Sequence, residues 1–226
     1  MNQETQLNLT HLMRPALVKP EEGRAAPLLL LLHGRGADEA DLMGLEEALD
    51  PRFVVVSPRA PYTYGDGWAW YGRADVGRPD RETFQAGLGE LRTFIEALPA
   101  AYGVDRARVY IFGFSQGAIV GSALTMLAPE IVAGLVMHSG YLPAALEGNR
   151  EILEAAKPRS LEGKAIFMAH GEYDTVVPVG MGRATYEYLA NVRANVIYRE
   201  YPIGHAISEE SLYDASEWVT RLIDDV

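Results

Sequence analysis

Short apolar runs alternate along this chain with longer segments in which apolar residues recur every three or four positions. The short runs predict strands at 27–33, 53–57, 108–113, 132–138, 164–170 and 195–201, with an edge strand near 6–13. The longer segments predict helices at 38–49, 80–102, 116–127, 180–192 and 208–224. Most of the strands are apolar on both faces. The alternation therefore predicts an α/β fold, with a mostly parallel central sheet and helices on both of its faces.

Two connections, 58–79 and 139–163, are longer than the tight loops that usually join strands to helices. Both contain proline and glycine, and loops of this kind often carry function. Neither is long enough to form a domain, and no internal repeat is visible. At 226 residues, the chain is expected to form a single domain spanning 1–226.

The charge balance argues against several classes of partner. The chain has 20 Lys and Arg against 31 Asp and Glu, a formal charge of −11 that disfavours nucleic acid and anionic lipid. The absence of cysteine excludes disulfides, thiolate metal sites and cysteine nucleophiles. The N-terminal segment does not resemble a secretory signal, and the aliphatic run at 28–32 is too short to span a membrane. We expect a cytoplasmic protein without membrane insertion.

One motif, Gly113-Phe114-Ser115-Gln116-Gly117, carries chemistry. It matches G-x-S-x-G, and a predicted strand lies directly before it and a predicted helix directly after it. In this context the serine stands in a strained turn with its hydroxyl projecting beyond the strand ends, and glycines on either side avoid a collision. The motif predicts Ser115 as a nucleophile. The alternative is a passive serine in a glycine-flanked turn.

A serine nucleophile needs a base, which in an α/β-hydrolase follows the acid in the chain. Of the five histidines, only His205 lies in a late loop, "YPIGHAIS", with a helix after it. His11 precedes the core, whereas His33, His138 and His170 end predicted strands, where packing is the expected role. The order of the motifs predicts His205 as the general base.

The acid that orients the histidine is expected in the segment "HGEYDTVVPVG". Asp174 lies in its turn, where a carboxylate can accept the Nδ1 proton of the histidine. Aspartate is also common in turns for purely structural reasons. Glu172 is the nearest alternative acid, and Asp214 is discounted because it falls inside the last helix.

Two backbone amides are candidates for an oxyanion hole. The amide of Gln116 lies at the first turn of the predicted helix, where unpaired N–H groups and the helix dipole favour negative charge. The amide of Arg35, in "LLHGRGAD", lies in a glycine-rich turn after an early strand. The same turn also suits a general anion-binding nest.

The segments "LLHGRGAD", "GFSQGA", "HGEYDTVVP" and "GHAIS" together resemble the bacterial carboxylesterase and phospholipase family of α/β-hydrolases, which includes the acyl-protein thioesterases. The resemblance extends from about residue 25 to the end. It implies a serine hydrolase with little or no cap domain, no metal and no cofactor. It also implies Ser115, Asp174 and His205 as the triad and the amides of Arg35 and Gln116 as donors.

The substrate pocket is the part of the resemblance that transfers least. Family members often have a hydrophobic residue in place of Arg35, and the loop at 58–79 is unusually aromatic here. The expected substrate-binding residues, each with ordinary core packing as its alternative, are Trp68, Trp70, Leu142, Val176 and Ile207. Arg73 and Arg78 either meet an acidic group of the substrate or are solvated.

The sequence thus predicts a hydrolase of small-molecule carboxylic esters with short to medium acyl chains. The alternatives are an acyl thioesterase or lysophospholipase of the same family, and a non-catalytic binding protein that retains the fold. A homodimer is possible. The sequence leaves the chain length, the leaving group and the physiological substrate open.

Overall fold

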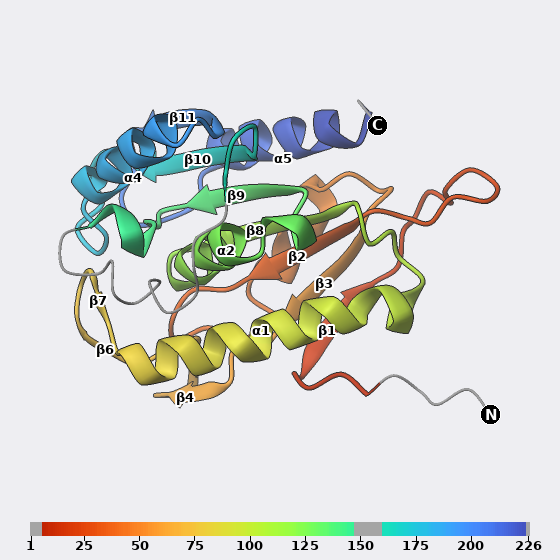
Figure 1. Cartoon of the computed structure of the whole chain (residues 1–226), viewed down its shortest axis with the longest axis horizontal. Coiled ribbons are helices and arrows are strands. Elements are labelled where there is room, and N and C mark those ends of the chain that lie inside the picture. Colours follow the sequence, from red (N-terminus) through yellow and green to blue (C-terminus); the bar gives the residue numbers. More distant parts are fainter. Residues whose placement is uncertain (1–5, 147–159, 225–226) are drawn as a thin grey trace.

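The computed structural model describes residues 6–146 and 160–224. Within them, seven strands form one sheet in the order β1-β3-β2-β8-β9-β10-β11 (Figure 1). Edge strand β1 runs antiparallel to β3, and the other neighbouring strands are parallel. The strands are β1 (His11–Arg14), β2 (Leu28–Leu32), β3 (Val54–Pro58), β8 (Val109–Phe114), β9 (Gly134–His138), β10 (Ala165–Gly171) and β11 (Asn195–Tyr201).

Strand β2 shows why the central strands are apolar on both faces. All five of its leucines are fully buried. Leu28, Leu30 and Leu32 belong to the core on one side of the sheet, whereas Leu29 and Leu31 belong to the core on the other side. Side chains alternate across a strand, so a strand covered on both faces needs apolar residues at every position.

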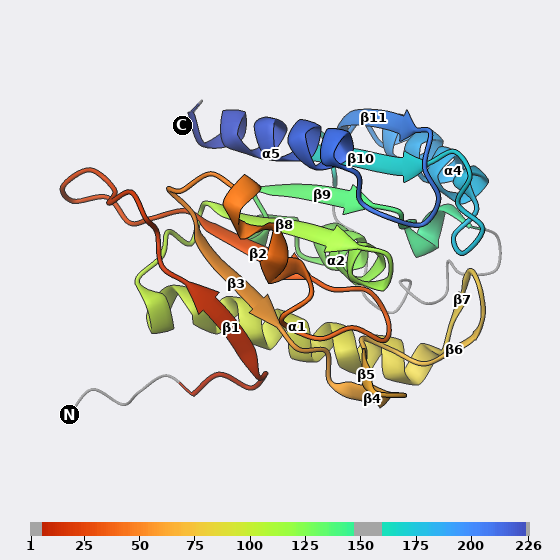
Figure 2. The same cartoon turned by 180° about the vertical axis from the view of Figure 1, so that it is seen from behind.

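Helices cover both faces of the sheet, as the sequence predicts. One face carries α1 (Arg81–Tyr102), α2 (Gln116–Leu127) and α4 (Val179–Asn191). The other face carries α5 (Glu209–Asp224) and the 3₁₀ helix η1 (Leu42–Ala48), which are seen in front of the sheet in Figure 2. No helix in the described part of the chain is long and apolar enough to cross a membrane.

The connection at 58–79 folds as two hairpins. Its first hairpin pairs β4 (Tyr62–Tyr64) with β5 (Gly67–Ala69), and its second pairs β6 (Arg73–Asp75) with β7 (Arg78–Pro79). The connection at 139–163 lies partly outside the described residues. Its described part includes the 3₁₀ turn η3 (Pro143–Ala145), and a further such turn, η2 (Pro129–Ile131), precedes β9.

Two predicted elements differ from the structure. The segment 38–49 forms the shorter η1 instead of an α-helix, with no side-chain cap at Asp41. It also contains Gly44, and glycine weakens a helix interior. The edge strand is limited to His11–Arg14, because only these residues pair with β3.

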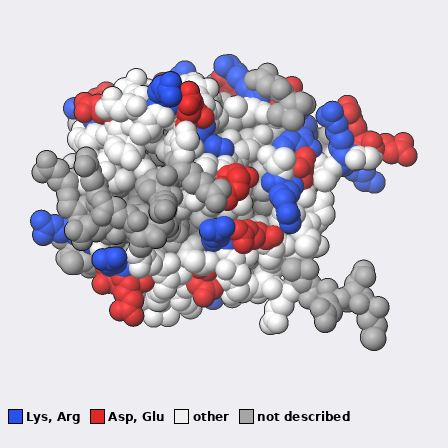
Figure 3. All heavy atoms as spheres, in the orientation of Figure 1, with Lys and Arg blue, Asp and Glu red and all other residues white. Residues whose placement is uncertain are grey.

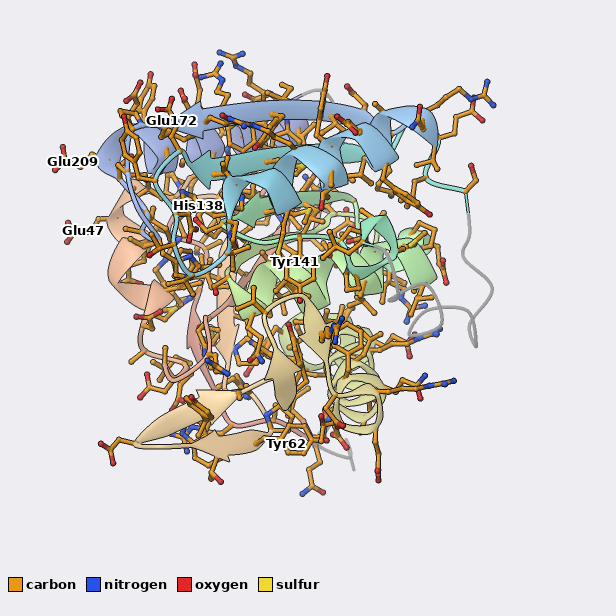
Figure 4. The ribbon with its side chains drawn as sticks, turned by 90° about the vertical axis from the view of Figure 1, so that its left-hand side faces the viewer. Glu47, Tyr62, His138, Tyr141, Glu172 and Glu209 are labelled. Atoms are coloured by element: carbon orange, nitrogen blue, oxygen red, sulfur yellow. The ribbon has the colours of Figure 1, made fainter. Side chains whose placement is uncertain are left out.

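The parallel strands present their carboxyl ends at one edge of the sheet, the left-hand side of Figure 1 and the side that faces the viewer in Figure 4. His138, the last residue of β9, lies close to the middle of this edge in Figure 4. The loops after β2, β8, β10 and β11 leave the sheet here. Ligands of open α/β sheets bind at this edge.

Candidate active site

Ser115 occupies a strained turn between β8 and α2. Its backbone has φ 51° and ψ −116°, a conformation that side-chain-bearing residues rarely adopt. A Cβ at Gly117 would lie 1.9 Å from the carbonyl oxygen of Leu32, and one at Gly113 would lie 2.6 Å from the backbone of Ala118. The absence of side chains at these two glycines therefore allows the turn to pack closely against the end of β2 and the first turn of α2.

A row of hydrogen bonds joins Ser115, His205 and Asp174. The Nε2 atom of His205 lies 2.9 Å from Oγ of Ser115, and its Nδ1 lies 2.7 Å from Oδ2 of Asp174. Because a carboxylate only accepts, Nδ1 carries the proton and Nε2 is left to accept one from the serine hydroxyl. In this geometry, His205 can accept the proton of the serine hydroxyl and Asp174 can orient the imidazole.

Asp174 is buried and fully engaged. Its Oδ1 accepts the backbone N–H groups of Val176 at 2.9 Å and Val177 at 2.8 Å, while Oδ2 faces His205. The alternative acid, Glu172, is exposed and lies at the periphery of the edge in Figure 4. The structure therefore brings Asp174 to the histidine and leaves Glu172 outside.

The loops that carry the acid and the histidine are fastened to each other. The N–H of Glu172 donates to the carbonyl oxygen of Tyr201 at 2.8 Å, and the N–H of Tyr173 donates to the carbonyl oxygen of Ile203 at 3.0 Å. A Cβ at Gly171 would lie 2.2 Å from the carbonyl oxygen of Gly204. The pairing of β10 with β11 thus continues into the two loops.

Of the other four histidines, three are buried and His11 is half-buried on the edge strand. His138 bonds Oγ of Ser211 at 2.9 Å, and burial lowers its pKa to about 3. Burial also lowers the pKa values of His33 and His170. His11 contacts the carbonyl oxygen of Leu9 at 2.8 Å.

His33 shapes the turn that follows β2. Its Nε2 accepts the N–H of Ala60 at 3.1 Å, so its Nδ1 carries the proton and donates to the carbonyl of Gly34 at 2.7 Å. His170 lies beneath the acid loop, with Nε2 2.8 Å from the carbonyl oxygen of Val177. Both neutral rings therefore hold the backbone of loops that form the site.

Two backbone amides next to the serine have no acceptor within the described residues. They belong to Arg35, in the turn after β2, and Gln116, at the start of α2. Two hydrogen bonds next to Arg35 fix the turn after β2. The N–H of Gly36 donates to the carbonyl oxygen of Trp68 at 2.7 Å, and the N–H of Trp68 donates to the carbonyl oxygen of Ala37 at 2.9 Å. Unpaired N–H groups beside a serine hydroxyl are suited to donate to a negatively charged oxygen.

The side chain of Gln116 ties the aromatic loop to the serine turn. Its Oε1 accepts the N–H of Trp70 at 2.8 Å, and its Nε2 donates to the carbonyl of Tyr71 at 2.7 Å. The indole of Trp70 is fully buried and donates to the carbonyl of His33 at 2.9 Å. This arrangement places Tyr71 at the cavity.

The cavity beside Ser115 has a volume of about 180 Å³. Its walls are largely apolar. The described residues that line it are Gly34, Arg35, Tyr71, Val76, Gly77, Phe114, Ser115, Gln116, Ile119, Tyr141, Val176, Val177 and His205. In Figure 4, Tyr141 lies near the middle of the edge, whereas Tyr62 lies out on the β4–β5 hairpin.

Of the five expected pocket residues, only Val176 lines this cavity. Trp70 and Leu142 are buried in the core, and Trp68 stacks against Arg59, which lies 4.8 Å from its ring centre. Ile207 packs against the core that contains α5. Their apolar character serves the core instead of the cavity.

Sequence reasoning missed the aromatic and aliphatic residues that do form the walls. Tyr71 follows a buried tryptophan directly, and Tyr141 follows the end of β9 at the carboxyl edge. The sequence signal that could have indicated Tyr141 is its position just after a predicted strand. Arg78 is exposed and does not line the cavity, and the side chain of Arg73 is not among those described. No cluster of three or more His, Asp or Glu suited to a metal occurs in the described chain.

Comparison with known proteins identifies the family of the chain. The profile of the phospholipase/carboxylesterase family matches residues 13–223. Acyl-protein thioesterase 1 of Neurospora crassa is 27% identical over 94% of this chain and 94% of its own length. The corresponding protein of Debaryomyces hansenii is 30% identical over 75% and 73%.

The carboxylesterase of Bacillus cereus has a similar solved structure. Its TM-score is 0.83 at 25% identity, with 97% of each chain covered. The sheet order, the helices on both faces and the family match together show the α/β-hydrolase fold. The chain therefore belongs to the phospholipase/carboxylesterase family of α/β-hydrolases.

Proposed function

We propose that this protein hydrolyses carboxylic esters of short to medium acyl chains through an acyl-enzyme on Ser115. The observation that carries the proposal is the hydrogen-bonded row from Ser115 through His205 to Asp174. The two unpaired amides of Arg35 and Gln116 support it, because they lie at the same cavity. The family match supports an ester or thioester as the substrate.

In the first step, Oγ of Ser115 attacks the acyl carbonyl carbon while its proton passes to Nε2 of His205. Asp174 stabilises the resulting imidazolium through the Nδ1–H bond and stays ionised. The amides of Arg35 and Gln116 donate to the oxyanion of the tetrahedral intermediate. When that intermediate collapses, the alcohol leaves with the proton from Nε2.

In the second step, water takes the place of the serine. His205 accepts a proton from the water as its oxygen attacks the acyl carbon, and the same two amides hold the new oxyanion. Collapse of this intermediate releases the carboxylic acid, and the proton on Nε2 returns to Oγ of Ser115. The cycle uses only groups of the chain and one water.

The size of the cavity supports shorter acyl chains. Its volume of about 180 Å³ is small beside the roughly 300–1,000 Å³ of typical ligand pockets. Ile119, Val177 and Tyr141 give it an apolar wall against which a few methylene groups can pack. A long chain would extend beyond this cavity.

The proposal is tested by hydrolysis of p-nitrophenyl esters from acetate to palmitate, with Ser115→Ala as the matched variant. We expect the highest kcat/KM at short to medium chains and a loss of turnover on the order of a millionfold in Ser115→Ala. Circular dichroism checks that both proteins are folded. A maximum at palmitate would contradict the short-chain proposal and favour a lysophospholipase or a long-chain thioesterase.

Thioesterase activity is the second candidate, favoured by relatives named acyl-protein thioesterase 1. Matched oxygen and thiol esters of the same acyl group separate the two activities through the ratio of their kcat/KM values. Covalent labelling with a fluorophosphonate probe tests the alternative of a non-catalytic binding protein. We expect the parent protein to be labelled and Ser115→Ala to remain unlabelled. An unlabelled, folded parent protein would favour the binding role.

A further inference from the structure

Arg35 is the one residue with a permanent charge among the described residues that line the cavity. The other walls of the cavity are apolar, aromatic or neutral and polar. This arrangement contrasts with the whole chain, whose formal charge is −11. A cation beside the cavity of an acidic protein favours the entry of a substrate group with a negative charge.

Arg35 has no carboxylate partner within the described residues. Among the carboxylates that follow it in the same loop, Glu39 pairs with Arg59, and Oδ1 of Asp38 accepts the N–H of Ala40 at 2.9 Å. Elsewhere many of the basic groups lie against acidic ones, as Figure 3 shows for one face.

Tyr64 supports the unpaired guanidinium. The central carbon of the Arg35 guanidinium lies 4.5 Å from the centre of the Tyr64 ring, which comes from the β4–β5 hairpin. Stacking of this kind uses the flat face of the guanidinium. Its N–H groups, which lie in the plane, remain able to donate two parallel hydrogen bonds to a carboxylate.

Arg59 provides a direct comparison. It also lies over an aromatic ring, that of Trp68, but its Nε and Nη2 donate to the carboxylate of Glu39 at 2.6 and 2.5 Å. Arg59 is thus neutralised within the fold and lies outside the cavity lining. Arg35 has the same kind of aromatic support with the anion missing.

We propose that Arg35 is a specificity-determining residue that selects esters bearing a carboxylate in addition to the scissile ester. The inference rests on the proposed function, because turnover of such an ester requires Ser115. The apolar wall takes the hydrocarbon part of the substrate, and the guanidinium binds the free carboxylate. After hydrolysis, the additional carboxylate is carried by the released acid or by the released alcohol, depending on the side of the ester on which it stands.

Two substrate pairs test the inference on either side of the scissile bond. On the acyl side, monoethyl succinate is compared with ethyl 4-methylpentanoate, in which an isopropyl group replaces the carboxylate. On the alcohol side, 4-acetoxybenzoate is compared with its methyl ester. The measured quantity is the kcat/KM of the charged member divided by that of the neutral member.

We expect this ratio in at least one pair to fall about tenfold or more in Arg35→Gln, since hydrogen bonds between charged groups are among the stronger ones. Both substrates of a pair are measured on the same variant. A change in the position of the Arg35 amide therefore alters both kcat/KM values and cancels in their ratio. Arg35→Lys should retain part of the preference, because it keeps the charge without the fork. Arg59→Gln is the matched control and should leave the ratio unchanged.

Calorimetric binding to Ser115→Ala separates this inference from the proposed function. We expect the charged ester of the preferred pair to bind more tightly than its neutral partner, and the difference to disappear in Ser115→Ala/Arg35→Gln. Arg35-dependent binding without turnover would overturn the proposed function and leave the inference standing. Hydrolysis of neutral esters, with ratios in both pairs unaffected by Arg35→Gln, would overturn the inference and leave the proposed function standing.

Discussion

At the residue scale, Asp174 has the most fully specified surroundings in the site. Oδ1 receives two backbone amides and Oδ2 faces Nδ1 of His205, so the carboxylate has one orientation. His170 lies 3.6 Å from Oδ2 and is held by the carbonyl of Val177. This environment keeps an acceptor, and no donor, against the imidazole.

Replacing Asp174 with Asn tests that arrangement. The substituted amide can present its N–H₂ to Nδ1, which favours the tautomer with the proton on Nε2 and removes the acceptor that Ser115 needs. We expect turnover of a p-nitrophenyl ester to fall by roughly 10⁴ with the fold intact, by analogy with the same change in a serine protease. Stopped-assay kinetics and a thermal melt provide the two readouts.

Glu172→Gln is the matched control for this prediction. Glu172 is two positions from Asp174, carries the same charge and is exposed. We expect it to retain nearly all activity. A large loss in Glu172→Gln together with full activity in Asp174→Asn would reverse the assignment of the acid.

At the element scale, the β4–β5 hairpin supports the turn that presents the Arg35 amide. The hairpin bonds this turn through Trp68, which donates to Ala37 and accepts from Gly36. Gly67 makes this contact possible, because a Cβ there would lie 2.0 Å from the carbonyl oxygen of Gly36. A hairpin remote from Ser115 in sequence thus sets the position of a proposed oxyanion donor.

Gly67→Ala should therefore displace the turn after β2. We expect kcat to fall by up to about 10²-fold, because removing one oxyanion-hole donor in other hydrolases costs 10² to 10³. Gly89→Ala in α1 is the control, since a Cβ there meets nothing within 4 Å and alanine favours a helix. Equal kcat values for Gly67→Ala and the parent protein would show that the hairpin does not position the amide.

At the scale of the whole molecule, three buried histidines make the stability of the fold depend on pH. His33, His138 and His170 lie at or within one residue of the ends of central strands, and burial lowers the pKa of each below its ordinary value. In the unfolded chain these histidines titrate near pH 6.5. Between that value and the lower folded-state pKa, only the unfolded chain takes up protons.

The free energy of unfolding should therefore decrease as the pH falls below about 6.5. For His138, whose folded-state pKa is about 3, the decrease is about 1.4 kcal/mol per pH unit between these two values. Urea unfolding at pH 7, 6 and 5 measures it. His138→Gln removes the titrating group and should lower the slope by that amount, whereas an unchanged slope would show that His138 is protonated in the folded protein.

Much of the fold follows from local pattern. Strand Asn195–Tyr201 and helix Gln116–Leu127 match their predicted limits, and the other parallel strands differ by about two residues or less. The periodicity of apolar residues is a local property of the sequence, so it predicts an element without knowledge of the elements that pack against it. The predicted α-helix at 38–49 failed where short length and a glycine favoured a 3₁₀ segment.

The candidate site was predictable for a related reason. Ser115, Asp174 and His205 each follow a predicted strand, and parallel strands end at one edge of the sheet. Order and position along the chain were therefore enough to select them. The pocket walls were not predictable in this way, because Trp70 and Tyr71 are neighbours of similar character and only one of them faces the cavity.

The sequence by itself determined the strands and helices, the serine turn and the order of the three residues in the hydrogen-bonded row. The tertiary structure alone decided which aromatic residues line the cavity, that Asp174 and not Glu172 meets His205, and that Arg35 has no anion while Arg59 has one. The reason is physical. Secondary structure follows from residues a few positions apart, whereas the burial and charge pairing of a side chain depend on partners brought close only by folding.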